Sequence, residues 1–143
     1  MKKFAVIVLF GFMGTLALSV GCDDSDAADD KPYDYRPRES DAGLQRGQAS
    51  VDRAVIVVLE SEPPQYRLEI EGTLPTPCHA WRAVVRPPDS THRIKVEVYS
   101  VVDPDVMCIQ VIENFRGVVD LPTPPPGRYT VMVNGRNAGS LER

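Results

Sequence analysis

The chain has 143 residues, of which 43% are hydrophobic and 25% charged, and its formal net charge is −4. This length suits one small domain together with a terminal segment. The excess of acids over bases argues against a nucleic-acid partner, because binding to phosphates requires a concentrated basic surface.

The first 22 residues have the organisation of an export signal. Lys2 and Lys3 precede an apolar run over residues 4–20, and Cys22 follows it. The run has about 17 residues, the lower limit for a transmembrane helix, so an uncleaved membrane anchor is the alternative interpretation. Residues 18–22, Leu-Ser-Val-Gly-Cys, resemble the lipobox of bacterial lipoprotein precursors, with the Leu one position farther from the Cys than is usual.

The lipobox resemblance implies that residues 1–21 are a signal peptide and that Cys22 carries a lipid. The protein would then be attached to a membrane of the bacterial cell envelope, facing the periplasm or the exterior. Several acyl chains, at about 0.8 kcal/mol for each buried methylene, make a stable anchor. Asp23 and Asp24 resemble an inner-membrane retention signal but also simply begin an acidic linker, so the inner and the outer membrane both stay open.

Residues 22–50 are predicted to be the lipidated cysteine and a disordered acidic tether. Residues 23–50 hold eight acids, four bases and almost no aliphatic side chain larger than alanine. Such a segment buries too little apolar surface to offset the entropy lost on ordering. As a flexible coil it would span about 30 Å root-mean-square.

From Val51 onward the composition changes to short β-branched runs separated by prolines. The run over residues 51–59 is almost continuously apolar, which predicts a strand that is covered on both faces or pairs centrally in a sheet. Residues 65–72 and 93–101 alternate between apolar and polar, which predicts strands with one buried face. The full set of predicted strands is 51–59, 65–72, 81–86, 93–101, 107–112, 117–121, 127–133 and 137–141.

These seven or eight short strands recur about every ten residues, and no amphipathic helix pattern is present. Residues 51–143 are therefore predicted to form an all-β domain, an antiparallel β-sandwich that is immunoglobulin-like in its broad architecture. Asn134-Gly135 predicts a two-residue hairpin between the last two strands, because both residue types tolerate positive φ.

Two cysteines, Cys78 and Cys108, remain besides Cys22. In an oxidising compartment an even pair predicts a disulfide, which would close a loop of about 30 residues and stabilise the fold by about 3.5 kcal/mol. Two free thiols, or a zinc site completed by His79 and His92, are the alternatives. Adjacent ligands at 78 and 79 and the lack of a Cys-x-x-Cys clamp argue against zinc. We expect no metal and no other cofactor.

The sequence contains no recognisable catalytic residues. Its serines lie in no Gly-x-Ser-x-Gly or Ser-x-x-Lys motif, neither histidine has an evident partner, and no glycine-rich phosphate loop occurs. We therefore expect a protein that is not an enzyme.

One segment combines features of a binding loop: Pro75, Pro77, Cys78, His79 and the only tryptophan, Trp81. Loops constrained by proline and a disulfide lose little entropy on binding, and tryptophan is common at binding hot spots. The alternative, which we favour, is that Trp81 packs on the disulfide in the core, as in many immunoglobulin-like domains.

The segments Leu-Pro-Thr-Pro-Cys-His, Met-Cys-Ile-Gln and Pro-Pro-Gly-Arg-Tyr-Thr-Val-Met-Val-Asn-Gly resemble an uncharacterised domain of bacterial exported proteins, over about residues 70–141. The resemblance supports a Cys78–Cys108 pair and implies no activity. The function expected is that of an envelope lipoprotein whose sandwich binds a protein or glycan partner or serves structurally. The alternative is an immunoglobulin-like protease inhibitor, in which loops 73–80 or 122–127 would enter an active-site cleft.

Overall fold

A computed structural model describes residues 34–143, so the predicted signal peptide and the lipidation site at Cys22 lie outside the described residues. Within residues 34–143, no helix is long and apolar enough to cross a membrane. The elements are η1 (Glu39–Gly43), β1 (Gln45–Gln48), β2 (Ser50–Leu59), β3 (Gln65–Leu74), β4 (Ala80–Val85), β5 (Arg93–Val102), β6 (Glu113–Leu121), β7 (Arg128–Val133) and β8 (Arg136–Glu142).

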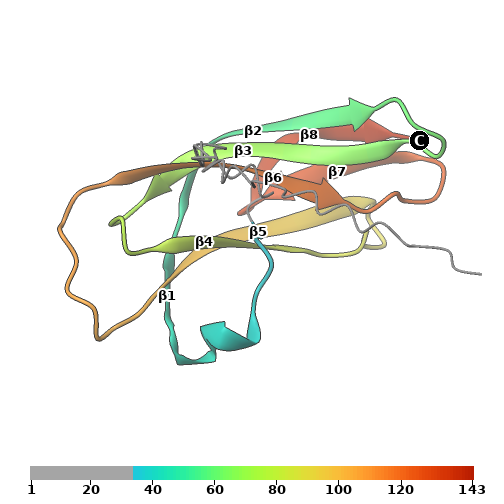
Figure 1. Ribbon diagram of the computed structural model, residues 1–143. Coiled ribbons are helices and arrows are strands. Elements are labelled where there is room, and N and C mark those ends of the chain that lie inside the picture. Colours follow the sequence, from blue (N-terminus) through green and yellow to red (C-terminus); the bar gives the residue numbers. More distant parts are fainter. Residues whose placement is uncertain (1–33) are drawn as a thin grey trace, which may run out of the picture.

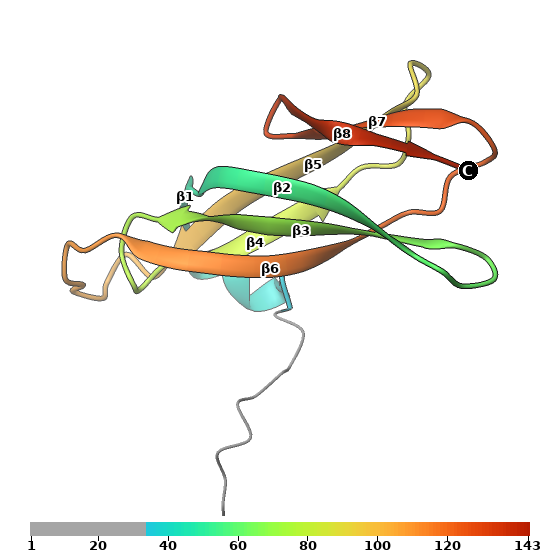
Figure 2. The ribbon, with the colours of Figure 1, turned by 90° about the horizontal axis from the view of Figure 1, so that it is seen from above.

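The strands form two sheets that pack face to face, which confirms the predicted β-sandwich (Figures 1 and 2). One sheet has the order β2-β3-β6, and the other contains β4, β5, β1, β7 and β8. Strand β4 pairs with one edge of β5. The other edge is shared, with β7 beside residues 93–96 and β1 beside residues 99–102. The β5–β7 pairing is parallel, the one departure from the predicted antiparallel arrangement.

The core lies between the two sheets and follows the alternation of the sequence. Leu68 and Ile70 of β3, Ile94 of β5, Val119 of β6 and Val131 of β7 are all 0% exposed. The residues beside them along each strand are more exposed, as the period of two requires, and in β3 and β5 these neighbours are charged. The inward-facing positions predicted for 65–72 and 93–101 are confirmed.

The prediction that residues 51–59 form a strand that is covered on both faces or pairs centrally is wrong. Strand β2 lies at the edge of the three-stranded sheet, and none of its residues is fully buried. Val58, for example, is 56% exposed. β-Branched residues fit any pleated surface, so a continuous apolar run identifies a strand but not its place in the sheet.

The predicted strand at 107–112 is also wrong, because these residues form part of the loop between β5 and β6. Both edges of β5 are already occupied by β4, β1 and β7. Strand β6 begins only at Glu113, where it pairs with Leu74 of β3. The segment therefore has strand-like composition but pairs with no strand.

The prediction of a disordered tether over residues 22–50 is wrong for its second half. Residues 39–48 contain η1 and β1, and residues 34–43, here called the N-terminal strap, cross the open side of the sandwich. The N–H of Ala83 in β4 donates to the Tyr35 carbonyl (2.8 Å), and the N–H of Asp120 in β6 donates to the Tyr35 hydroxyl (3.1 Å). One tyrosine thus joins the edge strands of both sheets.

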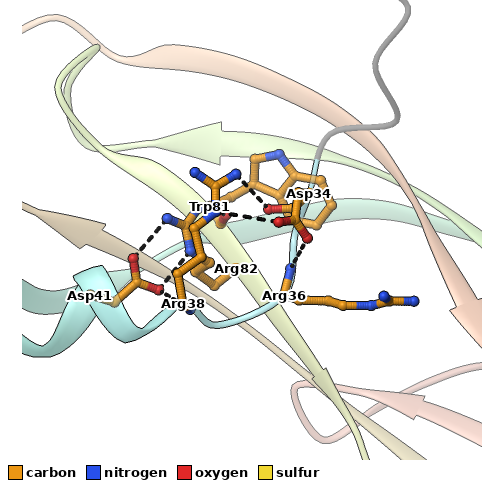
Figure 3. A network of polar contacts seen from close by, with 6 residues as sticks. All are labelled: Asp34, Arg36, Arg38, Asp41, Trp81 and Arg82. Carbon is orange, nitrogen blue, oxygen red and sulfur yellow. Dashed lines mark hydrogen bonds and ion pairs between the residues drawn. The ribbon is translucent and has the colours of Figure 1, made fainter.

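A buried ion pair fastens the strap to β4 (Figure 3). The Arg82 guanidinium donates from Nε and from a terminal nitrogen to the two oxygens of Asp41, at 2.8 and 2.9 Å. The two side chains are only 8% and 12% exposed. The hydrogen bond from Arg82, followed by that from the Arg38 N–H, lowers the pKa of Asp41 from 3.8 to about 2, because both favour the carboxylate.

This lowered pKa predicts how an Asp41→Asn variant depends on pH. Since the folded-state pKa lies below the usual value, the ionised carboxylate stabilises the fold above about pH 4, and that contribution is lost as the pH falls towards 2. The variant should therefore have a lower thermal midpoint than the wild type at pH 6, and the gap should shrink markedly by pH 2.5. Circular dichroism melting curves test this, and a gap that is constant with pH would contradict it.

The predicted Asn134-Gly135 hairpin is confirmed, with φ values of 46° and 81°. The Asn134 side chain also completes the edge of β5 between β7 and β1. Its Oδ1 accepts from the N–H of Val98 (2.7 Å), and its Nδ2 donates to the Val98 carbonyl (2.9 Å). The side-chain amide therefore substitutes for a missing strand residue.

We expect Asn134→Gly to lower the free energy of unfolding by about 1–3 kcal/mol, because it removes both hydrogen bonds while glycine still tolerates the positive φ. Urea unfolding of the full chain in non-ionic detergent measures the loss. Asn134→Asp, which keeps the acceptor for Val98 but not the donor, should lose less than the glycine variant. Equal stability of all three proteins would show that the bonds to Val98 contribute nothing.

Candidate functional site

Two loops meet at one end of the sandwich, opposite the C-terminus (Figures 1 and 2). They are the β3–β4 turn over residues 75–79 and the β5–β6 loop over residues 103–112, here called the apolar loop. A disulfide between Cys78 and Cys108 joins them, with the two Cα atoms 6.0 Å apart. The predicted disulfide is confirmed, and it consumes the thiols that the zinc and free-thiol alternatives required.

The apolar loop exposes large hydrophobic side chains on both sides of the disulfide. Met107 is 93% exposed and Ile109 is 69% exposed, while Val106, Val111 and Ile112 are between 51% and 69% exposed. Single exposed apolar residues are ordinary on a protein surface, but a contiguous group of this kind marks an interaction site. The loop is therefore the leading candidate for the functional surface.

The backbone of the apolar loop is exposed as well. Among the hydrogen bonds of residues 34–143, none has the N–H of residues 107–110 as its donor, and the N–H of Val111 donates only to Ile109, at 3.1 Å. A segment that offers both exposed apolar side chains and backbone donors without a partner among residues 34–143 suits pairing with a strand of another protein.

The β3–β4 turn is held firmly against the sandwich. Thr76 is 5% exposed, and its Oγ1 lies 2.8 Å from His79 Nδ1. The His79 ring also lies close to Gly47 of β1, where an added Cβ would be 3.4 Å from Nε2. His79 is half-buried and fixes the turn, whereas Pro75 and Pro77 are exposed beside the disulfide.

Trp81 belongs to the core, which agrees with the interpretation that the sequence analysis favours. It is 6% exposed, and its ring stacks on Phe115 and Tyr35 with centroid separations of 5.4 and 5.9 Å. Gly117 of β6 lies against the indole, where a Cβ would come within 2.0 Å of Cζ2. These contacts bury Trp81 in the core, so it is a weak candidate for a binding residue.

Two grooves lie on the sandwich. One, of about 1040 Å³, runs beside the aromatic stack of Trp81 and reaches Glu113, the residue after the apolar loop. The other, of about 790 Å³, lies between β1, β2 and the β7–β8 turn. In the second groove Arg46 is paired with Glu97 and lies 3.6 Å from the Tyr99 ring centroid, so its most prominent charge is already neutralised. Within the described chain, no cluster of three or more His, Cys, Asp or Glu side chains could hold a metal ion.

The ORF11 β-sandwich domain matches residues 68–142, from β3 to β8, a range that contains both disulfide cysteines and the apolar loop. An "uncharacterized 10.2 kDa protein in HgiCIIM 5′ region" of Herpetosiphon aurantiacus is 35% identical over 85 residues, which cover 59% of this chain and 89% of the relative. A similar protein from the HgiBIM 5′ region of that organism is 35% identical over 75 residues, covering 52% and 90%. No solved structure gives a significant match. The chain belongs to the ORF11 β-sandwich domain family.

Proposed function

We propose that this protein is a lipid-anchored binding protein of the bacterial cell envelope, without catalytic activity, which engages a protein partner through the apolar loop. The observation that carries the proposal is the exposure of Met107, Ile109 and their apolar neighbours around the Cys78–Cys108 disulfide. The lipid anchor at Cys22 and the export signal before it support the location, through the lipobox resemblance of residues 18–22.

A protein partner fits the loop better than a glycan or a membrane surface. Exposed Met, Ile and Val side chains offer no hydrogen bonds to sugar hydroxyls, whereas buried apolar anchors are typical of protein interfaces. Residues 96–115 contain four acids and no lysine or arginine. Anionic headgroups would repel this charge, while membrane-binding loops are usually basic.

The disulfide makes the loop more effective as a binding surface. A free ten-residue loop would lose conformational freedom on binding, and that entropy would reduce the affinity. The bond from Cys108 to Cys78 restricts the loop beforehand and anchors it to the rigid turn held by Thr76 and His79.

The proposal is tested with a paired substitution in the loop. Full-length chain carrying Met107→Asp and Ile109→Asp is crosslinked in intact cells and compared with wild type. Wild-type adducts of defined mass should disappear in this variant. The matched control, Val55→Asp with Val58→Asp at two solvent-exposed positions of β2, should retain them. Adducts that survive the loop substitutions, or that vanish only in the control, would overturn the proposal.

A further inference from the structure

We propose that the apolar loop is an inhibitory loop, and that Met107 occupies the specificity pocket of an endopeptidase that accepts large apolar side chains. This inference rests on the proposed function, because it names the class of partner that the same loop binds. It differs from the sequence-based expectation, in which loops 73–80 or 122–127 entered the cleft.

The disulfide sets the direction of the side chains in the loop. Cys108 is bonded to Cys78 and so points towards the sandwich. The side chains on either side of Cys108, those of Met107 and Ile109, face solvent, with exposed fractions of 93% and 69%. Met107 is thus a single long apolar side chain presented beside a covalent anchor.

The backbone around Met107 is available for main-chain pairing in an endopeptidase cleft. Residues 107–112 belong to no helix or strand, and among the described residues the N–H groups of 107–110 have no protein acceptor. Recognition of an extended segment combines main-chain pairing with a pocket for alternate side chains, and a specificity pocket selects one of them. Both elements are available on the apolar loop.

The other two loops are less suitable because they are folded onto the sandwich. In loop 73–80, Leu74 and Thr76 are buried, and the His79 ring is hydrogen-bonded to the Thr76 hydroxyl. In loop 122–127, Pro124 is fully buried and its carbonyl accepts a hydrogen bond from the Arg143 guanidinium (2.9 Å). Neither loop presents a large apolar side chain to solvent.

The proposal is tested with the full chain, purified in non-ionic detergent, against three serine endopeptidases. Chymotrypsin and subtilisin accept large apolar side chains, and trypsin requires lysine or arginine. Wild type should inhibit at least one of the first two at micromolar concentration while its loop stays uncleaved. Met107→Lys should weaken that inhibition by about 100-fold, the size expected for a central anchor, and should create inhibition of trypsin. Val118→Lys, on the exposed face of β6, is the matched control and should change neither.

Failure of wild type to inhibit either apolar-specific enzyme, or rapid cleavage of the loop as an ordinary substrate, would overturn the inference. So would a Met107→Lys variant that folds with an unchanged thermal midpoint but gains no inhibition of trypsin. If inhibition fails but wild type still gives crosslinked adducts that the Met107→Asp and Ile109→Asp substitutions abolish, only the inhibitor assignment fails and the proposed binding function stands. If the inhibition and the loop-dependent adducts are both absent, the inhibitor assignment and the binding function are both overturned.

Discussion

Trp81→Ala is expected to lower the free energy of unfolding by about 3–5 kcal/mol, the usual loss for removal of a large buried aromatic side chain. The indole is 6% exposed and stacks between Phe115 and Tyr35. The indole packs between residues of the strap and β6, so its removal leaves a cavity. A shift of one of these elements alone would not fill that cavity. Because Trp81 is the only tryptophan, urea unfolding is followed by circular dichroism and not by tryptophan fluorescence.

The matched control is Trp81→Phe, which keeps an aromatic ring in the stack and should lose clearly less stability than the alanine variant. If Trp81→Ala does not fold at all, the stability of Trp81→Phe can still be measured and compared with that of the wild type. A loss below about 1 kcal/mol for Trp81→Ala would be typical of a surface position. That result would return Trp81 to the set of candidate binding residues.

Removal of the disulfide is expected to have an effect of similar size. Replacing both Cys78 and Cys108 with serine should lower the free energy of unfolding by about 3.5 kcal/mol, because the unfolded chain regains the entropy of a loop closed over 30 residues. The same variant should also release the apolar loop from the β3–β4 turn. Urea unfolding measures the stability, and limited proteolysis should show new cleavage between residues 103 and 112.

Reduction of the wild type provides the control for this prediction. The reduced, alkylated protein should unfold at the same urea concentration as the double-serine variant, while the non-reduced wild type unfolds at a higher one. Mass spectrometry of the non-reduced protein should find residues 78 and 108 in one linked peptide. Alkylation of both cysteines without prior reduction would contradict the structure.

The strands that the sequence predicts best are those with a strict alternation of apolar and polar residues. In β3 and β5 this pattern identifies both the strand and its buried face, since one side of each lies against the opposite sheet. The β7–β8 hairpin is equally clear from Asn134-Gly135, where the backbone conformation itself selects the residues. Local chemistry decides these features, so they can be read from the sequence.

The features that sequence reasoning missed depend on contacts between distant residues. The strap has the composition of a disordered segment, but Asp41 finds a buried partner in Arg82, and Tyr35 bonds to β4 and β6. Residues 107–112 have the composition of a strand, but they pair with no strand, and both edges of the preceding strand β5 are occupied. The signal that could have singled out the apolar loop as a candidate surface is its run of apolar residues on both sides of the disulfide cysteine Cys108.

The central claim is that the apolar loop, held by the disulfide, is the surface through which this domain binds a protein. Site-specific photo-crosslinking in intact cells tests it most directly, with the photoreactive residue placed at 107 or 109 in the loop and, as controls, at 118 on β6 or 55 on β2. We predict adducts to one protein from positions 107 and 109, absent from both controls and suppressed by an excess of unlabelled wild-type chain. Adducts to phospholipid from position 107, or equal protein adducts from all four positions, would contradict the claim.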